Sequence, residues 1–410
     1  MGFRALCGAH HRCSFPAGAA PARLALLGLA VFAVACAPPA PLLVEAEPGA
    51  HLPGLSTEER ALFEAGRALF TQPFTPAQGL GPLFNQTQCS SCHDLPTSGG
   101  HGAEPVRKAT RYEAASGCDL LEDAGGDLLQ AYVTAEGRAA GLTPEMIPAE
   151  ATGISEIHAP PLFGLGLVEA LSTERVAATE DPDDRDGDGI SGRMGRSADG
   201  RPALFGLKAV HPTLHSFIEG ATRGELGLTT PEHPEEERAA GSAVPAAADP
   251  APDPEVDAAF LEAVSAFVRL LAPPAAAVPE DRAAQEAARR GERVFAEAGC
   301  DGCHTPLWTT GVTTSAALSR KTFRAYSDFL LHDMGPGLAD VCAVGVAPSE
   351  WRTARLVGLR LRTTYLHNGR AQRVEDAILL HGGEAQRSRD VFAALGSQER
   401  QDLLHFLGTL

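Results

Sequence analysis

Apolar residues recur at helical spacing in two segments of the chain. In residues 56–72, Leu62 and Leu69 lie two helical turns apart, and Ser56 can cap the first turn. Residues 281–298 have the same character. The first segment contains the string Gly-Arg-Ala-Leu-Phe and the second contains Gly-Glu-Arg-Val-Phe. The pattern predicts two related helices.

The duplication extends to the end of each half. Residues 256–271 and 403–410 are both amphipathic and both close a segment. A proline-rich stretch at 273–280 separates the halves. We therefore predict an N-terminal domain at 56–272, a linker at 273–280 and a C-terminal domain at 281–410.

The first half carries a long insertion with no persistent period. Residues 79–230 are dense in Gly and Pro, so we expect long loops and short helices there rather than a sheet. Residues 232–254, rich in Pro, Ala and acid, predict a solvated, mobile surface loop. The expected fold class is all-α.

The N-terminal residues read as an export signal. Residues 1–23 are basic without any acid, and the apolar run 24–35 is too short to span a bilayer. Small residues lead into Cys36, as in bacterial lipoprotein signals; a plain signal-peptidase cut nearby is the alternative. We predict a signal peptide at 1–35, a flexible tether at 36–55, and a periplasmic or cell-envelope protein held to the membrane only by a lipid on Cys36.

The net charge of the chain limits the classes of partner that it can bind. Its 410 residues include 34 Lys and Arg against 52 Asp and Glu, for a formal net charge of -18. No basic cluster interrupts this excess, which excludes a phosphate-tracking groove for nucleic acid. An anionic membrane surface would also repel the chain. The acidic surface favours a basic protein partner.

Two Cys-x-x-Cys-His motifs follow the two related helices. This spacing is typical of c-type haem attachment, in which two thiols bond one porphyrin and the adjacent His binds the iron. Zinc would require the Cys pairs to lie closer in sequence, a redox dithiol would require a strand and a helix around it, and a disulfide within each pair is the third alternative. The residues are Cys89, Cys92, His93, Cys300, Cys303 and His304.

Further motifs resemble those of the di-haem oxidoreductase family, which is related to bacterial di-haem cytochrome c peroxidases and MauG-type proteins. The resemblance covers residues 56–410 and implies two cytochrome-c-like domains with one covalent haem c each. The motifs are Ala-Pro-Pro-Leu-Phe-Gly-Leu-Gly-Leu-Val-Glu-Ala at 159–170, Asp-Gly-Asp-Gly-Ile-Ser-Gly-Arg at 186–193, Phe-Gly-Leu-Lys-Ala at 205–209 and Leu-His-Asp-Met-Gly-Pro-Gly-Leu-Ala-Asp at 331–340.

The sixth iron ligand distinguishes an electron-carrying haem from one that binds substrate. For the second haem we predict Met334, in a turn-rich segment thirty residues after the motif; His332 is the nearest competitor. Related peroxidases place a Met where this chain has Leu366, and MauG-type enzymes use a Tyr near there, which leaves Tyr365 as an alternative. A Met-ligated haem would be the electron store of higher potential.

The first haem is predicted to be open. Family members commonly have Met where this chain has Leu226, which cannot bind iron; His101 or His158 could fill the position instead. The resemblance places His158 and Glu169 in the segment that carries distal-pocket residues, so both are candidate catalytic acid/base groups. Trp308 is a candidate relay between the haems, with aromatic packing as the alternative.

Two remaining features suggest a cation site and a disulfide. Asp184, Asp186 and Asp188 alternate like the first half of an EF-hand loop, although the closing Glu is missing, so calcium and a solvated acidic loop are both open. Cys118 and Cys342 remain once export and haem are accounted for, and they could pair.

These features together predict an exported di-haem c-type cytochrome that acts as a peroxidase-like oxidoreductase, with one electron-transfer haem and one open haem. Peroxide is the candidate substrate and a small redox protein the candidate electron partner. The alternative is a non-enzymatic electron-transfer cytochrome with both irons fully ligated.

Overall fold

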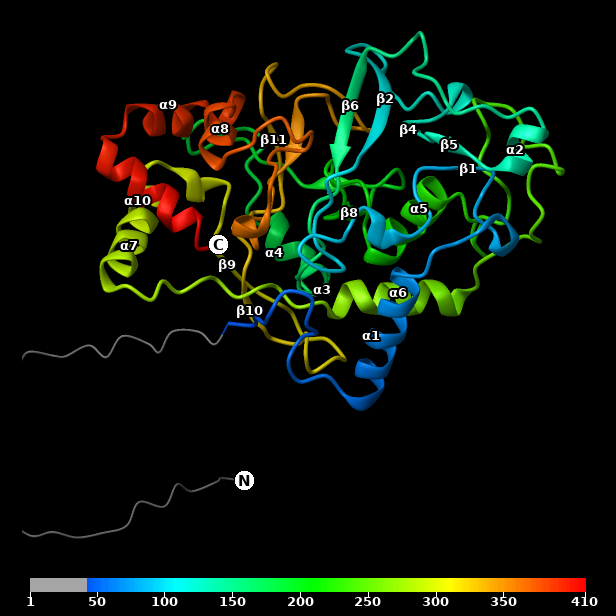
Figure 1. The fold of residues 1–410 in the computed structure, drawn as a ribbon. Coiled ribbons are helices and arrows are strands. Elements are labelled where there is room, and N and C mark those ends of the chain that lie inside the picture. The colour runs from blue at the N-terminus through cyan, green and yellow to red at the C-terminus, as the bar shows by residue number, and fades with distance from the viewer. Residues whose placement is uncertain (1–42) are drawn as a thin grey trace, which may run out of the picture. The chain divides into compact units, whose positions relative to one another are not determined.

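Residues 43–410 are described by the computed structural model (Figure 1). The predicted signal segment 1–35 and the predicted lipid-bearing Cys36 lie outside the described residues. The described residues fall in one compact unit. Within this part of the chain, no helix is both long enough and apolar enough to cross a membrane.

Helices and short strands are interspersed along the chain. The helices are α1 (Thr57–Phe70), α2 (Ala135–Ala139), α3 (Leu165–Glu169), α4 (Thr173–Ala177), α5 (Leu214–Leu226), α6 (Ala258–Leu270), α7 (Arg282–Glu297), α8 (Val374–Leu379), α9 (Gln386–Ala394) and α10 (Ser397–Leu407). The strands are β1 (Leu83–Phe84), β2 (Pro105–Glu113), β3 (Gly117–Asp119), β4 (Leu128–Leu129), β5 (Tyr132–Val133), β6 (Gly153–His158), β7 (Gly195–Arg196), β8 (Pro202–Ala203), β9 (Leu307–Thr309), β10 (Thr322–Arg324), β11 (Leu331–Asp333) and β12 (Glu350–Arg352).

The helices predicted from periodicity are present, and they pack in two pairs, α1 with α6 and α7 with α10 (Figure 1). In each pair, a glycine of the first helix meets a backbone carbonyl of the second. A Cβ atom added at Gly66 would lie 1.9 Å from Ala263 O, and one added at Gly291 would lie 2.0 Å from Asp402 O. The glycine shared by the two sequence strings therefore marks an equivalent helix crossing in each half.

Polar side chains set where three of these helices start. Ser56 accepts a hydrogen bond from the Glu59 amide while Glu59 accepts one from the Ser56 amide, a reciprocal cap for α1. Asp257 and Asp281 each accept from the amide three residues later, at the starts of α6 and α7. The caps supply acceptors for amides that have no partner inside the helix.

A small antiparallel sheet lies in the insertion of the first half. Strand β2 pairs with β3, β4 and β6, with Val106 opposite Ile157. The other strands form four two-stranded ribbons, β1 with β5, β7 with β8, β9 with β10 and β11 with β12.

The prediction of an all-α fold is wrong, because the structure is a mixed α/β fold with 31% of its residues in helices and 15% in strands. The sheet occupies the insertion, where the sequence predicts loops and short helices. In β6 the polar Ser155 is buried whereas Ile154 is exposed, so apolar residues do not alternate along the strand. Strand β2 begins at Pro105 and is mostly polar. Neither strand therefore carries the period-two pattern of a half-buried strand.

Part of the predicted tether packs against the rest of the protein. In residues 43–55, Leu52 is fully buried and its amide donates to Leu270 O at 2.8 Å. The Glu45 carboxylate pairs with Arg324 at 2.7 Å. The prediction of a flexible tether is therefore wrong for this stretch, because its apolar side chains find partners in the core.

The buried apolar residues form two main clusters. The larger packs α1, α3, α5 and α6 together and also takes in Trp308, Phe323 and Phe329 from the second half. The smaller lies around α7, α9 and α10 and includes Phe295 and Phe392. The division into two domains stays a prediction, but residues from both sides of the predicted linker share the larger cluster.

Candidate functional site

Both Cys-x-x-Cys-His motifs line one cavity of about 1330 Å³, which we call the central cavity. This volume exceeds the ~300–1,000 Å³ typical of small-molecule pockets. Its apolar lining comes from both core clusters, with Phe70 and Leu226 from the larger and Phe295 and Leu403 from the smaller. The cavity offers room for bulky, largely apolar groups beside both motifs.

The two motif histidines are held in the same way. His93 Nδ1 donates to the carbonyl oxygen of Gly100 at 3.0 Å, and His304 Nδ1 donates to that of Tyr326 at 2.8 Å. A carbonyl can only accept, so the proton must be on Nδ1 in both rings. Nε2 of each imidazole therefore keeps a lone pair, the arrangement found in metal-binding histidines.

Burial favours the neutral form of both rings. It lowers the pKa of His93, and it lowers the pKa of His304 to about 4. The phenylalanine that ends each shared string lies close by, with Phe70 at 6.2 Å from His93 and Phe295 at 6.4 Å from His304 between ring centroids. The equivalent helices thus place equivalent apolar groups beside the two neutral imidazoles.

The four motif cysteines are unpaired. Burial raises the pKa of Cys89, Cys92 and Cys300 to about 12 each, and it also raises the pKa of Cys303. Thiols with raised pKa values are less reactive than the thiolates of redox motifs. Neither motif forms a disulfide, which disfavours the local-disulfide interpretation.

A family model described as "Di-haem oxidoreductase, putative peroxidase" matches residues 151–410, more than half of the chain. The chain belongs to the di-haem oxidoreductase family. Membership implies two haem cofactors. The residues fit this requirement, because two free thiols and one histidine with an available Nε2 line the central cavity at each motif.

Several solved structures resemble this di-haem oxidoreductase. Hydrazine synthase of Kuenenia stuttgartiensis shares 15% identity, with a TM-score of 0.43 over 92% of this chain and 97% of that chain. A MauG-like protein associated with microbial copper homeostasis shares 17% (TM-score 0.38; 91% and 94%). The dihaem peroxidase BthA of Burkholderia thailandensis shares 14% (TM-score 0.41; 90% and 90%). No curated protein matches the sequence detectably.

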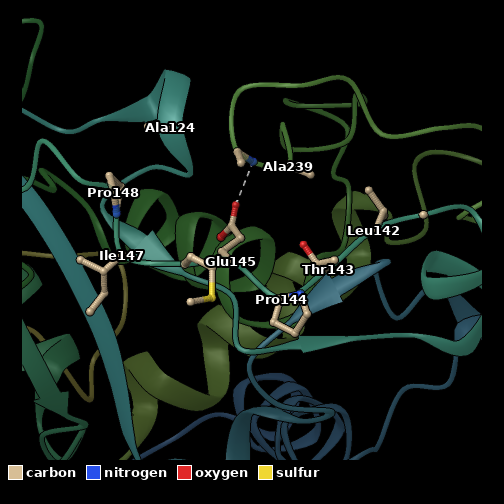
Figure 2. Close-up of a pocket in the computed structure, with 11 residues that line it drawn as sticks. Ala124, Leu142, Thr143, Pro144, Glu145, Ile147, Pro148 and Ala239 are labelled. Atoms are coloured by element: carbon tan, nitrogen blue, oxygen red, sulfur yellow. Dashed lines mark hydrogen bonds between the residues drawn. The ribbon is translucent and has the colours of Figure 1, made fainter.

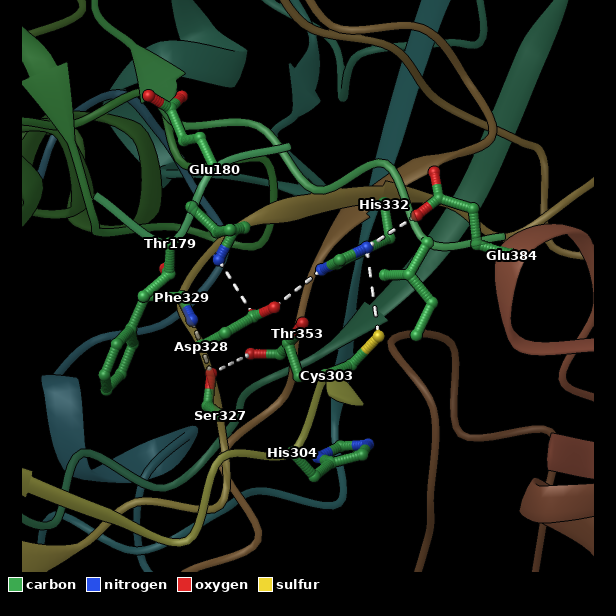
Figure 3. Close-up of polar contacts among 12 residues, drawn as sticks. Thr179, Glu180, Cys303, His304, Ser327, Asp328, Phe329, His332, Thr353 and Glu384 are labelled. Carbon is green, nitrogen blue, oxygen red and sulfur yellow. Dashed lines mark hydrogen bonds and ion pairs between the residues drawn. The ribbon is translucent and has the colours of Figure 1, made fainter. Parts of the chain in front are cut away.

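Beside the second motif, His332 is already fully bonded (Figure 3). Its Nε2 lies 2.8 Å from Asp328 Oδ2 and its Nδ1 lies 2.7 Å from Glu384 Oε2. Burial alone would lower the pKa of His332, but the hydrogen bonds to Asp328, Cys303 and Glu384 outweigh it and raise the pKa to about 12. Both nitrogens of His332 are therefore engaged, so its candidacy as a sixth ligand finds no support here.

Met334 and Tyr365 both line the central cavity. The Met334 side chain packs against the cluster of Ile157, Val341 and Trp351. The Tyr365 hydroxyl donates to Arg362 O at 3.2 Å. Ligation of the second iron by Met334 stays a prediction, and the Tyr365 hydroxyl is engaged elsewhere.

Leu226 and Glu225 end α5 beside the first motif. Leu226 is 1% exposed and lines the cavity. Glu225 lies near enough to Cys89 and Cys92 for its charge to raise the pKa of both. Burial, the largest effect, raises the pKa of Glu225 to about 7, although Asn85 donates to Oε2 at 3.1 Å. Glu225 could not be identified from the sequence, since its burial depends on the tertiary fold.

The predicted distal residues have separate environments. His158 lines the central cavity; its Nδ1 is buried without a partner, and its Nε2 lies against Gly369, where an added Cβ would approach to 2.5 Å. Glu169 is not among the lining residues, because its two oxygens accept from the Leu214 amide at 2.9 Å and from Arg269 at 2.7 Å. A distal role for Glu169 therefore finds no support.

Two other predicted candidates also lie outside the cavity lining. His101 is 2% exposed, and its Nε2 contacts Thr363 Oγ1 at 3.4 Å. Trp308 packs with Phe329 in the larger core cluster, and its indole N–H donates to Ser327 O at 2.8 Å. The packing interpretation of Trp308 fits the structure, and a relay role stays a prediction.

Asp184, Asp186 and Asp188 converge, so that one ligand atom from each lies within 4.8 Å of the others. Their oxygens also bond amides of the same loop, including Asp188 Oδ1 with the Ile190 amide at 2.8 Å. An acidic loop can adopt such bonds without an ion, so calcium at this position stays a prediction.

A disulfide joins Cys118 in β3 to Cys342, with a Cα to Cα distance of 5.8 Å. The bond ties the insertion of the first half to the second half, as the sequence analysis suggested for these two leftover cysteines.

A second, smaller hollow of about 390 Å³ lies on the insertion (Figure 2). Residues 141–148 line it together with Ala124, Ala239 and Ala240. Its polar centre, Glu145, accepts from the amides of Gln130 and Ala240. None of the predicted site residues lines this hollow.

Proposed function

We propose that the protein is an exported di-haem c-type cytochrome that acts as a peroxidase-like oxidoreductase. The observation that carries the proposal is the matched geometry of the two motifs, each with two unpaired cysteines and a neutral histidine whose Nε2 is free, around one cavity. The thiols would form thioethers to the porphyrins, with His93 and His304 as proximal ligands. Haems held in this way supply one-electron transfer and, at an open iron position, peroxide binding.

The two sites take different roles in this proposal. At the first site, Leu226 presents only carbon to the cavity, so this residue leaves an iron position free for a small molecule. The second site would be fully ligated and would hold an electron for the first. The shared cavity supports electron transfer between them, since no separate compartment divides the two motifs.

Glu225 is our candidate for handling protons at the first site. Reduction of hydrogen peroxide to two waters consumes two protons and two electrons, so a proton donor beside the open position favours the reaction. Glu225 lines the cavity, and its pKa of about 7 lets the carboxyl group both hold and release a proton near neutral pH. Asn85 bonds only Oε2, which leaves Oε1 for a bound peroxide or water.

Electrons would come from a small redox protein. The formal charge of -18 favours a basic donor, and such an encounter should slow as salt screens the charges. The basic and apolar residues before Cys36 support export and lipid anchoring. We accordingly propose the periplasm or cell envelope as the location of the reaction.

Haem content and ligand binding test the proposal. The mature protein should carry two covalent haems, measured by intact mass and by the pyridine haemochrome spectrum. Cyanide or peroxide should then bind one haem of the ferric or half-reduced protein, and peroxide should be consumed when a reduced donor is supplied. Two haems that both resist cyanide and peroxide would refute the peroxidase function and leave an electron carrier. Fewer than two covalent haems would refute the c-type assignment itself.

A further inference from the structure

The histidines that line the central cavity differ in what holds their rings. They are His93, His158, His211, His233, His304, His332, His367 and His381. His332 bonds carboxylates through both nitrogens, His233 bonds Glu219, and His367 bonds Asp340. Three rings instead donate Nδ1–H to a backbone carbonyl: His93, His304 and His381. The first two are the motif histidines, so His381 is a third ring held in the same way.

His381 Nδ1 lies 2.8 Å from Ala377 O, four residues earlier at the end of α8. A carbonyl cannot donate, so the proton is on Nδ1 and Nε2 keeps its lone pair. Capping the last carbonyls of a helix is a common role for histidine, and it explains the Nδ1 bond. That role leaves Nε2 unused, and no hydrogen bond to it is found in residues 43–410.

A row of cavity-lining residues runs along α8 and continues to His381, two residues past the end of the helix. Val374, Ala377, Ile378 and His381 all line the cavity, at the spacing of one helical face. Val374 and Ile378 also pack, together with Cys300 of the second motif, against the smaller core cluster. Burial lowers the pKa of His304 and the bond to Tyr326 opposes this, while His381 is near enough for its charge to lower that pKa further.

We propose that His381 Nε2 is the sixth ligand of the second haem iron, opposite His304. The proposal rests on the proposed function, since it requires a covalent haem at the second motif. Burial lowers the pKa of His381, which favours the neutral ring that iron binds. The backbone of Met334 lies beside Gly382, where an added Cβ would be 3.0 Å from Met334 O. Met334 and His381, the residue before Gly382, therefore border the same part of the cavity.

Met334 is then a packing residue. Its side chain already contacts the Ile157, Val341 and Trp351 cluster, whereas His381 Nε2 has no other partner among the described residues. Two imidazole ligands give a lower reduction potential than one imidazole and one thioether. The second haem would accordingly be a lower-potential electron store than a Met-ligated haem.

The test compares the haem-loaded wild type with His381→Ala, Met334→Leu and, as a control, His405→Ala on the exposed face of α10. The wild type should show a low-spin ferric haem whose EPR and near-infrared bands are those of two imidazoles. His381→Ala should lose this species and gain high-spin haem, and added imidazole should restore it. Met334→Leu and His405→Ala should keep it.

A second variant, His381→Met, keeps the proposal testable if His381→Ala does not fold. His381→Met should exchange the two-imidazole signature for that of an imidazole and a thioether, with a higher reduction potential. The proposal is overturned if the wild type shows a thioether band that Met334→Leu removes, or if either His381 variant keeps the wild-type spectrum. A haem count below two per wild-type chain would instead refute the proposed function. Failure of the ligand proposal and failure of the proposed function can therefore be distinguished.

Discussion

Gly66→Ala tests whether the crossing of α1 and α6 depends on the absence of a side chain. A Cβ atom at this position would lie 1.9 Å from Ala263 O and 2.9 Å from Phe267 Cβ. Real Cβ contacts essentially never fall below 3.0 Å, so the helices would have to separate by about 1.1 Å (3.0 minus 1.9). The obstacle is backbone, which cannot rotate away as a flexible side chain would.

Two opposing effects set how much Gly66→Ala changes the free energy of unfolding. Overpacking a close contact costs about 1–3 kcal/mol, and a rigid backbone partner argues for the upper end. Alanine gains about 1 kcal/mol over glycine in a helix interior. We therefore expect Gly66→Ala to lower the free energy of unfolding by about 2 kcal/mol. Gly291→Ala should do the same at the crossing of α7 and α10, where the Cβ would lie 2.0 Å from Asp402 O.

The matched control is the neighbouring, exposed Ala65 on the same helix. Ala65→Gly should cost about 1 kcal/mol, because only the intrinsic helix preference changes there. Equilibrium urea denaturation of the haem-loaded proteins, followed by far-UV circular dichroism, measures all three variants. If Gly66→Ala stabilises the protein by about as much as Ala65→Gly destabilises it, the close helix contact does not exist.

Three further predictions follow from the remaining features. Replacing Cys118 and Cys342 by Ser should lower the urea midpoint and abolish any effect of reductant on it. The loss in free energy of unfolding has an upper bound of about 5 kcal/mol, from the loop entropy of a 224-residue separation. An unchanged midpoint would contradict the disulfide. Because the pKa of Glu225 is raised from 4.5 to about 7, this group stabilises the native state below pH 4.5, and the contribution is lost as pH rises toward 7. Glu225→Gln should therefore flatten the dependence of stability on pH in this window and remove an ionisation near pH 7 from the pH dependence of peroxide turnover. If the pH profiles of the variant and the wild type superimpose, Glu225 does not handle protons at the first site. Calcium should raise the melting temperature of the wild type but not of Asp186→Ala, and chelator should reverse the rise; equal shifts in both proteins would place the ion elsewhere.

The helices α1, α6, α7 and α10 and the haem motifs were predictable because their signals are local. Amphipathic spacing and a capping Ser56 define α1 within one stretch of sequence, and the Cys-x-x-Cys-His spacing encodes its chemistry in five residues. The repeated Gly and Phe of α1 and α7 even indicated equivalent packing, which the two helix crossings show.

The rest depends on partners that are distant in sequence. Glu169 reads as a candidate acid, but Arg269, one hundred residues away, takes its carboxylate. From the sequence His332 is a candidate iron ligand, but in the structure Asp328 and Glu384 bond both of its nitrogens. His381 carries no motif, and only its position at the central cavity, just after α8, distinguishes it. The sheet of the insertion was not predicted for a related reason, since the burial of β2 and β6 follows tertiary packing and not an alternation of apolar residues.

The presence of Phe323 and Phe329 in the larger core cluster constrains how the chain can assemble. During synthesis, α1, α5 and α6 leave the ribosome long before these two aromatic residues, which lie beyond the second Cys-x-x-Cys-His motif. A nascent chain that stops at the proline-rich linker would therefore expose the apolar surface that they cover. The N-terminal half should depend on a chaperone, or stay incompletely packed, until about four-fifths of the polypeptide has been translated.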